Sequence, residues 1–516
     1  MLVDYARALR FRLMGLSMVA PLARLIEEYF NLVGPGVSIA DFGGVSGSDN
    51  TAAFERAIES GEAIYIPRGY EAKLSHADLL NADLVITGGG WTSQITHTDP
   101  TQHLFTAKAS NIKIRNVRLN GASSSEANGT FAIFTATADA PTGLDIENVY
   151  FTSKSAGLGF NNGIKFDGSC HYGRVSNCRI ERLYGAAAGY GYGVLVGAAD
   201  GVLIQNNHFF ASSGRGRHAA YLSSGASYCE VSGNYIDSFT WQGINQNSTG
   251  GSPIAYQNVI EGNILKNCVL NNNTTSGAIG IYGHSLGAII ANNQIYNSGS
   301  HGIAVDVSGE SDAISTTISG NKIRNSYNAG IDVLGANKVT IGVNEIIDSS
   351  QSGAGNYANI RLVRDATNTY ATQNVTITGN TIPASATARA AVTVNGSAPA
   401  PTGIVFGSNN FGAGTVATIE NSSNLAITLD GFTFYTGTWD PASIANGAST
   451  SQTFTATGAA LGDHVIASCS AQLQGLVLYA EVSAADTVRI VLNNNTGSAQ
   501  DIGNTNWRIW VRKKQF

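Results

Sequence analysis

Short alternations of apolar and polar residues recur along most of the chain. One phrase has an apolar residue, two or three small or polar residues that include Asn, and a second apolar residue, as in residues 146–151 (Ile-Glu-Asn-Val-Tyr-Phe). Eleven copies start at positions 114, 146, 175, 204, 231, 260, 290, 318, 341, 377 and 405, and most steps are close to 29 residues. Such a period indicates stacked structural repeats.

A second phrase lies between these copies and consists of a small residue, an apolar residue, any residue and an apolar residue. Residues 163–166 (Gly-Ile-Lys-Phe), 302–305 and 330–333 are examples. Each run alternates with a period of two and is too short for a helix. Two or more short strands in each turn of about thirty residues predict an all-β, right-handed parallel β-helix over residues 37–431. Asn at the corners tolerates a left-handed backbone, and its amide can pair with Asn in neighbouring turns.

The segments that flank the repeats follow other patterns. Residues 1–36 carry apolar residues at helical spacing, which favours a short helical segment over a secretory signal peptide. Residues 50–60 predict a helix whose apolar face covers the open end of the β-helix. Residues 432–516 lack the repeat and hold strand-length alternations separated by Gly and Asn, which predict a C-terminal antiparallel β-sandwich.

Composition disfavours several classes of function. Only 13% of residues are charged, the formal net charge is −6 and no basic block occurs, so a nucleic-acid partner is not expected. No apolar run is long enough to cross a membrane, so membrane insertion is not expected either. The five cysteines form no CxxC pair, which predicts buried thiols made in a reducing cytosol and no metal or other cofactor. A surface rich in Asn, Ser, Thr and Gly suits hydroxyl-rich ligands such as glycans.

Residues near the start of the repeats carry a family resemblance. Residues 41–43 (Asp-Phe-Gly), Asp49 with residues 51–54 (Thr-Ala-Ala-Phe), and residues 64–69 (Ile-Tyr-Ile-Pro-Arg-Gly) resemble the opening of the pectate-lyase-like β-helix proteins. That superfamily includes polygalacturonases and bacteriophage tailspikes. The chain departs from the pattern where Val-Ser-Gly-Ser at residues 45–48 replaces the second glycine-aspartate. The motif is structural, so the resemblance implies a fold and no particular chemistry.

The C-terminal segment resembles a different module. Residues 458–463, 484–486 and 493–495 are similar to the C-terminal module of phage tail-fibre and tailspike proteins. This resemblance implies a homotrimer, with residues 432–516 used for trimerisation or glycan binding, and a bacterial surface polysaccharide as ligand. It also implies a place in the virion tail after synthesis in the host cytoplasm. Residues 1–36 would then attach to the phage tail, its baseplate or an adaptor protein.

Because side chains alternate across a strand, the second phrase also assigns outward-facing residues. One outward column consists of Lys165, Leu195, Tyr221, Asn245, Gly280, Ala304, Asp332 and Arg361, and a second of Asp167, Gly197, Ser223, Asn247, Tyr282, Asp306 and Leu334. The columns mix carboxylates, amides, bases and aromatic rings, as a sugar-binding groove requires. We expect substrate contacts from Lys165, Arg217, His218, Tyr221, Asn245, Asn247, Tyr282, His284 and Arg361.

Asp306 and Asp332 are the candidate acid and base of a glycoside hydrolase. They lie on adjacent turns with an offset of two residues, which corresponds to a separation of ~8 Å. This value lies within the ~6.5–9.5 Å that leaves room for the attacking water of an inverting enzyme. Glu310, in the loop after Asp306, is a third candidate catalytic residue. Alternatively, Asp306 caps a turn and Asp332 lies on a solvated strand.

Arg217, His218 and Tyr221, with Lys165 two turns earlier, form a second constellation. A β-eliminating lyase needs a cation that neutralises a uronate carboxylate and a base that removes the C5 proton. Arg or Lys can supply the cation, and His, Tyr or Lys can supply the base. A basic surface loop is the alternative interpretation. His284 and His301 lack metal-ligand spacing with an acid, so we interpret them as groove or turn residues.

The leading hypothesis is therefore a tailspike-type depolymerase that binds and hydrolyses a capsule, exopolysaccharide or O-antigen. A polysaccharide lyase that acts on a uronate-containing glycan is the first alternative. A non-catalytic receptor-binding tail fibre is the second. A secreted pectinase-like enzyme is a third, which the C-terminal module disfavours.

Overall fold

The computed structural model describes residues 37–516, apart from residues 123–128, 136, 155–157, 169, 184–189, 212–214, 250, 272, 308–313, 366–368, 396–397, 422–424, 426, 430–431, 513 and 515–516. The helical segment predicted over residues 1–36 lies outside the described residues. The chain divides into two compact units, Met1–Gly243 and Ile244–Phe516. Each unit is described by itself.

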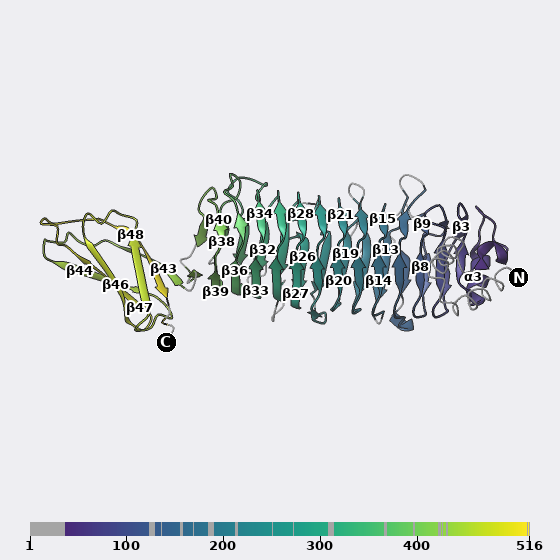
Figure 1. Ribbon diagram of the computed structural model, residues 1–516, viewed down its shortest axis with the longest axis horizontal. Coiled ribbons are helices and arrows are strands. Elements are labelled where there is room, and N and C mark those ends of the chain that lie inside the picture. The colour runs from purple at the N-terminus through teal and green to yellow at the C-terminus, as the bar shows by residue number, and fades with distance from the viewer. Residues whose placement is uncertain are drawn as a thin grey trace, which may run out of the picture. The chain divides into compact units, whose positions relative to one another are not determined.

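The described residues form a β-solenoid of about twelve turns with one short α-helix and a small antiparallel C-terminal part. Each turn contributes a strand to each of three parallel sheets, which we call A, B and C in the order in which a turn enters them (Figure 1). The predicted parallel β-helix is therefore confirmed. No helix among the described residues is long and apolar enough to cross a membrane.

In the N-terminal unit, neighbouring strands of each sheet come from successive turns. Sheet A holds β1 (Val37–Ser38), β2 (Ile64–Ile66), β5 (Val85–Gly88), β8 (Lys113–Arg115), β11 (Asp145–Glu147), β14 (Arg174–Ser176), β17 (Leu203–Gln205) and β20 (Glu230–Ser232). Sheet B holds β3 (Glu71–Leu74), β6 (Gln94–His97), β9 (Arg118–Asn120), β12 (Tyr150–Thr152), β15 (Arg179–Glu181), β18 (His208–Phe210) and β21 (Tyr235–Asp237). Sheet C holds β4 (Ala77–Leu79), β7 (Phe105–Ala107), β10 (Phe131–Thr135), β13 (Asn162–Asp167), β16 (Tyr192–Gly197) and β19 (His218–Ser223).

The solenoid part of the C-terminal unit repeats this arrangement. Sheet A holds β23 (Ala255–Tyr256), β24 (Val259–Glu261), β27 (Ser285–Ala291), β30 (Ile314–Ser319), β33 (Asn337–Gly342), β36 (Gln373–Thr378), β39 (Thr402–Phe406) and β42 (Ile427–Leu429). Sheet B holds β25 (Ile264–Lys266), β28 (Gln294–Tyr296), β31 (Lys322–Arg324), β34 (Glu345–Ile347), β37 (Thr381–Ile382) and β40 (Asn410–Phe411). Sheet C holds β22 (Ile244–Ser248), β26 (Gly277–Gly283), β29 (His301–Asp306), β32 (Ile331–Leu334), β35 (Ile360–Val363), β38 (Val392–Val394) and β41 (Ile419–Asn421).

Strand register fixes which residues face the core. Ile303 pairs with Ile331 and Val305 with Val333, and all four are fully buried. Side chains between them point outward, because orientation alternates along a strand. Within each unit, strand pairing places the members of both predicted outward columns side by side. For example, Ala304 pairs with Asp332, and Asp332 pairs with Arg361.

Asparagine at the corners has two separate roles. Asn292 has φ 56° and turns the chain, whereas the adjacent Asn293 is fully buried and extends a ladder of amides. In that ladder the Nδ2 atom of Asn293 donates to Oδ1 of Asn321 at 3.0 Å, and Asn321 donates in the same way to Asn344 at 3.0 Å. The ladder satisfies buried polar groups that a turn of chain would otherwise leave without partners.

The helix predicted over residues 50–60 is α3 (Thr51–Glu59), which buries Ala53, Phe54, Ala57 and Ile58. Two 3-10 turns, η1 (Ile39–Phe42) and η2 (Thr137–Asp139), are also present. Phe54 of α3 stacks on Phe105 with ring centroids 5.7 Å apart, so the helix packs directly on the solenoid core.

The C-terminal module consists of two antiparallel groups of three strands, the first of which continues sheet A because β42 pairs antiparallel with β43 (Phe432–Trp439). One has the order β43, β48 (Thr505–Arg512) and β45 (His464–Cys469), and the other β44 (Ser449–Thr455), β47 (Thr487–Asn493) and β46 (Val477–Ala484). Both groups contribute to one buried cluster that includes Phe454, Ile490 and Trp507. The expected small antiparallel sandwich is thus present.

Candidate functional site

The predicted site residues form two groups on sheet C or at its edge, one in each unit. Those of the N-terminal unit are Lys165, Arg217, His218 and Tyr221. Those of the C-terminal unit are Asn245, Asn247, Tyr282, His284, Asp306, Asp332 and Arg361. Glu310, the third candidate catalytic residue, lies outside the described residues.

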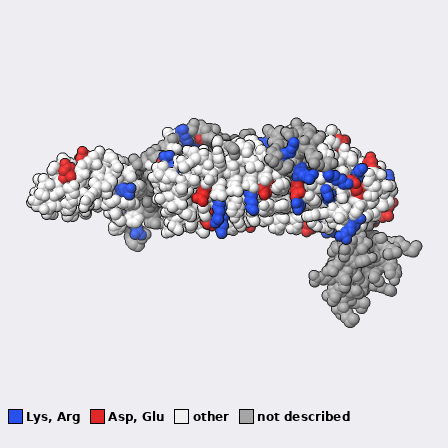
Figure 2. Space-filling view, turned by 90° about the horizontal axis from the view of Figure 1, so that it is seen from above, with Lys and Arg blue, Asp and Glu red and all other residues white. Residues whose placement is uncertain are grey.

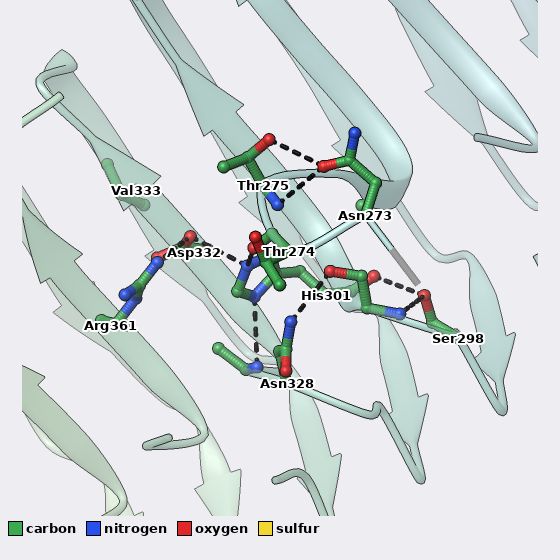
Figure 3. A network of polar contacts seen from close by, with 12 residues as sticks. Asn273, Thr274, Thr275, Ser298, His301, Asn328, Asp332, Val333 and Arg361 are labelled. Atoms are coloured by element: carbon green, nitrogen blue, oxygen red, sulfur yellow. Dashed lines mark hydrogen bonds and ion pairs between the residues drawn. The ribbon is translucent and has the colours of Figure 1, made fainter. Parts of the chain in front are cut away.

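A buried polar network surrounds Asp332 (Figure 3). Nε and Nη2 of Arg361 donate to Oδ1 and Oδ2 of Asp332 at 2.7 and 2.6 Å. On the other side, Nε2 of His301 lies 3.3 Å from Oδ2 of Asp332 and 2.8 Å from the carbonyl oxygen of Thr274. The side chains of His301 and Asp332 are fully buried, and 26% of the Arg361 side chain is exposed.

The hydrogen bonds of His301 define its tautomer. The backbone N–H of Ala329 donates to Nδ1 of His301 at 3.1 Å, so this nitrogen carries the lone pair. The proton must then be on Nε2, from which it is shared between the Thr274 carbonyl and Asp332. Burial lowers the pKa of His301, in agreement with a neutral ring at neutral pH.

Asp332 and Arg361 each stabilise the charged form of the other. Burial alone would raise the pKa of Asp332, but the charge of Arg361, the adjacent His301 and the Arg361 hydrogen bonds hold this pKa below its usual value. Burial opposes the charge of Arg361 as well, yet Asp332, Tyr357 and Asp306 together raise the pKa of Arg361. At neutral pH the network therefore consists of an anion, a cation and a neutral imidazole.

The alternative interpretation, in which Asp332 lies on a solvated strand, is wrong. Asp306 is 4% exposed and Asp332 is 0% exposed. The reason is that segments outside the strands cover this face. Thr274, which precedes β26, accepts from His301, and the ring of Tyr357, which precedes β35, lies 5.8 Å from the His301 ring and 5.2 Å from the Arg361 guanidinium carbon.

The other predicted residues of this unit lie in the two outward columns or at a corner. Asp306 pairs in register with Tyr282, whose hydroxyl accepts from the N–H of Gly277 at 3.3 Å. Oδ1 of Asn247 accepts from the N–H and the hydroxyl of Thr249, so this amide ends a strand. Oδ1 of Asn245 is buried and accepts no hydrogen bond from the described residues. His284 lies at the corner between β26 and β27.

The N-terminal unit presents rings and cations at the equivalent sheet. Tyr192 and Tyr221 stack with centroids 5.2 Å apart, and the His218 ring lies 5.1 Å from Tyr221. The guanidinium of Arg217 lies 4.8 Å above Trp241. These contacts bring together two of the four residues predicted for a lyase site, His218 and Tyr221, and the guanidinium of the adjacent Arg217 packs on Trp241.

His218 keeps a ring nitrogen with a lone pair, whereas the ammonium group of Lys165 is paired with a carboxylate. Nδ1 of His218 lies 3.1 Å from the carbonyl oxygen of Gln242 and must carry a proton, which leaves the lone pair on Nε2. Burial, with the charge of Arg217, lowers the pKa of His218 to about 3, so its ring is neutral. Lys165 is engaged by Asp167 at 2.8 Å and lies 5.1 Å from the Phe134 ring.

Several residues of these groups were missed from the sequence. The sequence pattern assigns His301 only a groove or turn role, and it assigns no role to Tyr192, Trp241 or Tyr357. Tyr192 pairs in register with His218 at the first position of adjacent strands, but it lies three residues before Leu195, so the two-residue alternation does not assign it to an outward column. Tyr357 lies outside the strands, and no periodic pattern marks it.

Comparisons with known proteins agree with the fold. No protein-family model matches the sequence, and no curated protein sequence matches it. The Dettilon tailspike protein is similar in structure, with a TM-score of 0.56 and 15% identity over 92% of this chain and 94% of that one. The catalytic unit of the GH87 α-1,3-glucanase from Streptomyces thermodiastaticus has a TM-score of 0.52 and 17% identity, over 76% of this chain and 70% of the other. At these identities the likeness shows the fold alone.

Proposed function

We propose that this chain, on the parallel β-helix fold that it shares with phage tailspikes and pectate-lyase-like carbohydrate enzymes, binds a bacterial surface polysaccharide and hydrolyses it. The observation that carries this proposal is the buried Asp332–Arg361 pair beside Asp306 on the outward side of a sheet. Burying charged groups is costly, and a solenoid needs no ions there, so an ionic network at such a position supports a functional role.

The electrostatics favour different roles for the two carboxylates. Asp332 is held ionised, and its fully buried carboxylate is engaged by Arg361, so it is suited to orient Arg361 and unsuited to donate a proton or to reach an attacking water. Asp306 is then the candidate general acid. Arg361, whose side chain is 26% exposed, is the candidate to bind substrate hydroxyl or carboxylate groups.

Conservative substitutions test these roles. Asp306→Asn keeps the size of the side chain but cannot exchange a proton, so hydrolysis should fall ~100- to 10,000-fold with polysaccharide binding retained. The assay is the release of new reducing ends from purified capsule and lipopolysaccharide. Thr393→Ala is a matched control, because Thr393 pairs in register with Arg361 on the next strand. Full activity of Asp306→Asn would contradict the proposal.

A lyase is the second candidate function, and the contact between His218 and Tyr221 supports it. An imidazole with a free lone pair, a nearby phenol at Tyr221 and a cation at Arg217 are the groups that β-elimination requires. Ultraviolet absorbance of an unsaturated product, lost in His218→Gln and kept in Asp306→Asn, would establish this function. If binding persists and neither product forms, the protein is a receptor-binding fibre.

We also infer a homotrimer in the virion tail that attaches through the N-terminal segment and acts at the bacterial surface. The apolar residues on the outside of the C-terminal module support association, since Ile466, Val477 and Tyr479 are each more than half exposed. Light scattering of the full chain and of a chain ending at residue 431 tests this. A monomeric full chain, or a truncated chain that remains trimeric with unchanged thermal stability, would contradict it.

A further inference from the structure

Sheet B of the N-terminal unit carries an outward row of rings and guanidinium groups that the proposed hydrolytic site does not use. The row contains Arg118, Tyr150 and Arg179 on successive turns, in register with one another. Both guanidinium carbons lie 5.4 Å from the centroid of the Tyr150 ring. Trp91, from the corner before β6, packs against the same ring with centroids 5.2 Å apart. Figure 2 shows Lys and Arg concentrated toward the N-terminal end of the β-helix.

Trp91 is fixed in place although it is exposed. Its indole N–H donates to the carbonyl oxygen of Asn148 at 3.1 Å, and 39% of the residue remains exposed to solvent. The polar atom of the ring is therefore already satisfied, and what the ring presents to solvent is apolar. A rigid aromatic surface of this kind loses little conformational entropy when a sugar ring stacks on it.

The two arginines of the row are not equivalent. Arg179 forms an ion pair with Glu181, which also accepts from the hydroxyl of Tyr150 at 2.7 Å. Arg118 donates through Nε to Oδ1 of Asn120 at 2.8 Å, and no described carboxylate pairs with it. Arg118 therefore retains an uncompensated charge, and its remaining N–H groups can bind a carboxylate in a bidentate manner.

From this arrangement we propose that Trp91, Tyr150 and Arg118 form a second polysaccharide site, which binds an acidic sugar of the chain. The sugar ring stacks on Trp91, and its carboxylate pairs with Arg118. The site anchors the polymer without cleaving it. The inference rests on the proposed function only in taking a glycan as the ligand.

The test uses the full-length protein in affinity electrophoresis through gels that contain polygalacturonate, alginate or neutral dextran. The wild type should be retarded by at least one acidic polymer and not by dextran. Trp91→Ala and Arg118→Gln should each weaken the apparent affinity about tenfold or more, while Trp91→Phe retains most of it. Lys322→Ala is the matched control, because it removes an outward cation from sheet B of the other unit, where 57% of the Lys322 side chain is exposed. Thermal unfolding verifies that each variant is folded.

Several outcomes would overturn the site. These are a wild type that neither acidic polymer retards, equal retardation by dextran, or Trp91→Ala migrating as the wild type. A change in the oligomeric state of Trp91→Ala with retardation intact would show that the row contacts another copy of the chain. Reducing-end assays on short soluble fragments separate this inference from the proposed hydrolysis. Trp91→Ala should keep that activity, whereas Asp306→Asn should lose it and still be retarded.

Discussion

The outward side of sheet C has the same backbone register in both units but a different physical character. In the N-terminal unit, Lys165 pairs with Asp167, and their side chains are 22% and 27% exposed. In the C-terminal unit, Asp332 occupies the same kind of outward position and is fully closed off from water. The strands do not cause this difference, because both columns follow from the same alternation. The segments between strands decide whether an outward charge is a surface group or a buried one.

This difference changes what each charge contributes. An exposed ion pair gains little because water screens it, whereas a buried pair has lost its hydration and depends on its partner. Removing one partner should therefore have unequal effects in the two units, and the predictions below test that inequality.

The largest effect is expected from Arg361→Met. This change leaves the Asp332 carboxylate buried without its cation, so the free energy of unfolding should fall by ~3–5 kcal/mol, as measured by urea denaturation. The double variant Arg361→Met with Asp332→Leu removes both charges and should recover most of that loss. A loss below about 1 kcal/mol in the single variant would show that Asp332 is in effect solvated, and the contrast between the units would be lost.

The second largest effect is expected in how the stability of the protein depends on pH. Burial lowers the pKa values of His97 and His103 to about 4 and that of His218 to about 3, all in the N-terminal unit. The unfolded chain takes up protons near pH ~6.5, before these folded histidines do, so their contribution to stability is complete above that pH and is lost as pH falls toward 4. His301 adds one such group to the C-terminal unit. Asp332 behaves differently, because its pKa is lowered and its contribution is lost only below pH ~4.

His218→Gln tests the acid effect. The variant should lose less stability than the wild type between pH 7 and pH 4, so that the gap between their thermal midpoints narrows on acidification. His171→Gln is the control, because the His171 side chain is 35% exposed. Parallel pH profiles for the wild type and His218→Gln would contradict the prediction.

The sequence was sufficient for the repeat, the strand alternation and the register of the outward columns, since these depend on periodic burial of residues such as Ile303 and Ile331. It was also sufficient to bring His218 near Tyr221. It did not reveal that Asp332 is buried, because that depends on how Thr274 and Tyr357 fold back over the sheet. Such contacts join residues far apart in sequence and leave no period to detect.

A smaller effect is expected for the ring stack of the N-terminal unit. Tyr221→Leu removes the aromatic contacts with Tyr192 and His218 but keeps an apolar side chain, so unfolding should become easier by ~0.5–1.5 kcal/mol. Urea denaturation measures this loss. Tyr221→Phe keeps the ring and is the control for stability. If both variants are equally destabilised, the hydroxyl rather than the stack is the important group.

The smallest effect is expected for Lys165→Met, which is the direct counterpart of Arg361→Met. Lys165 and Asp167 remain partly solvated, so losing the cation leaves a carboxylate that water can still reach. The free energy of unfolding should change by at most ~1 kcal/mol, and the change should shrink further in high salt, where surface pairs are screened. A double-mutant cycle with Asp167→Asn measures the coupling of the pair, and the same cycle on Asp332 and Arg361 should give a coupling several-fold larger that salt barely alters. Equal coupling energies in the two cycles would show that burial by the segments between strands does not strengthen the Asp332–Arg361 pair. The burial of this pair would then no longer mark a functional site.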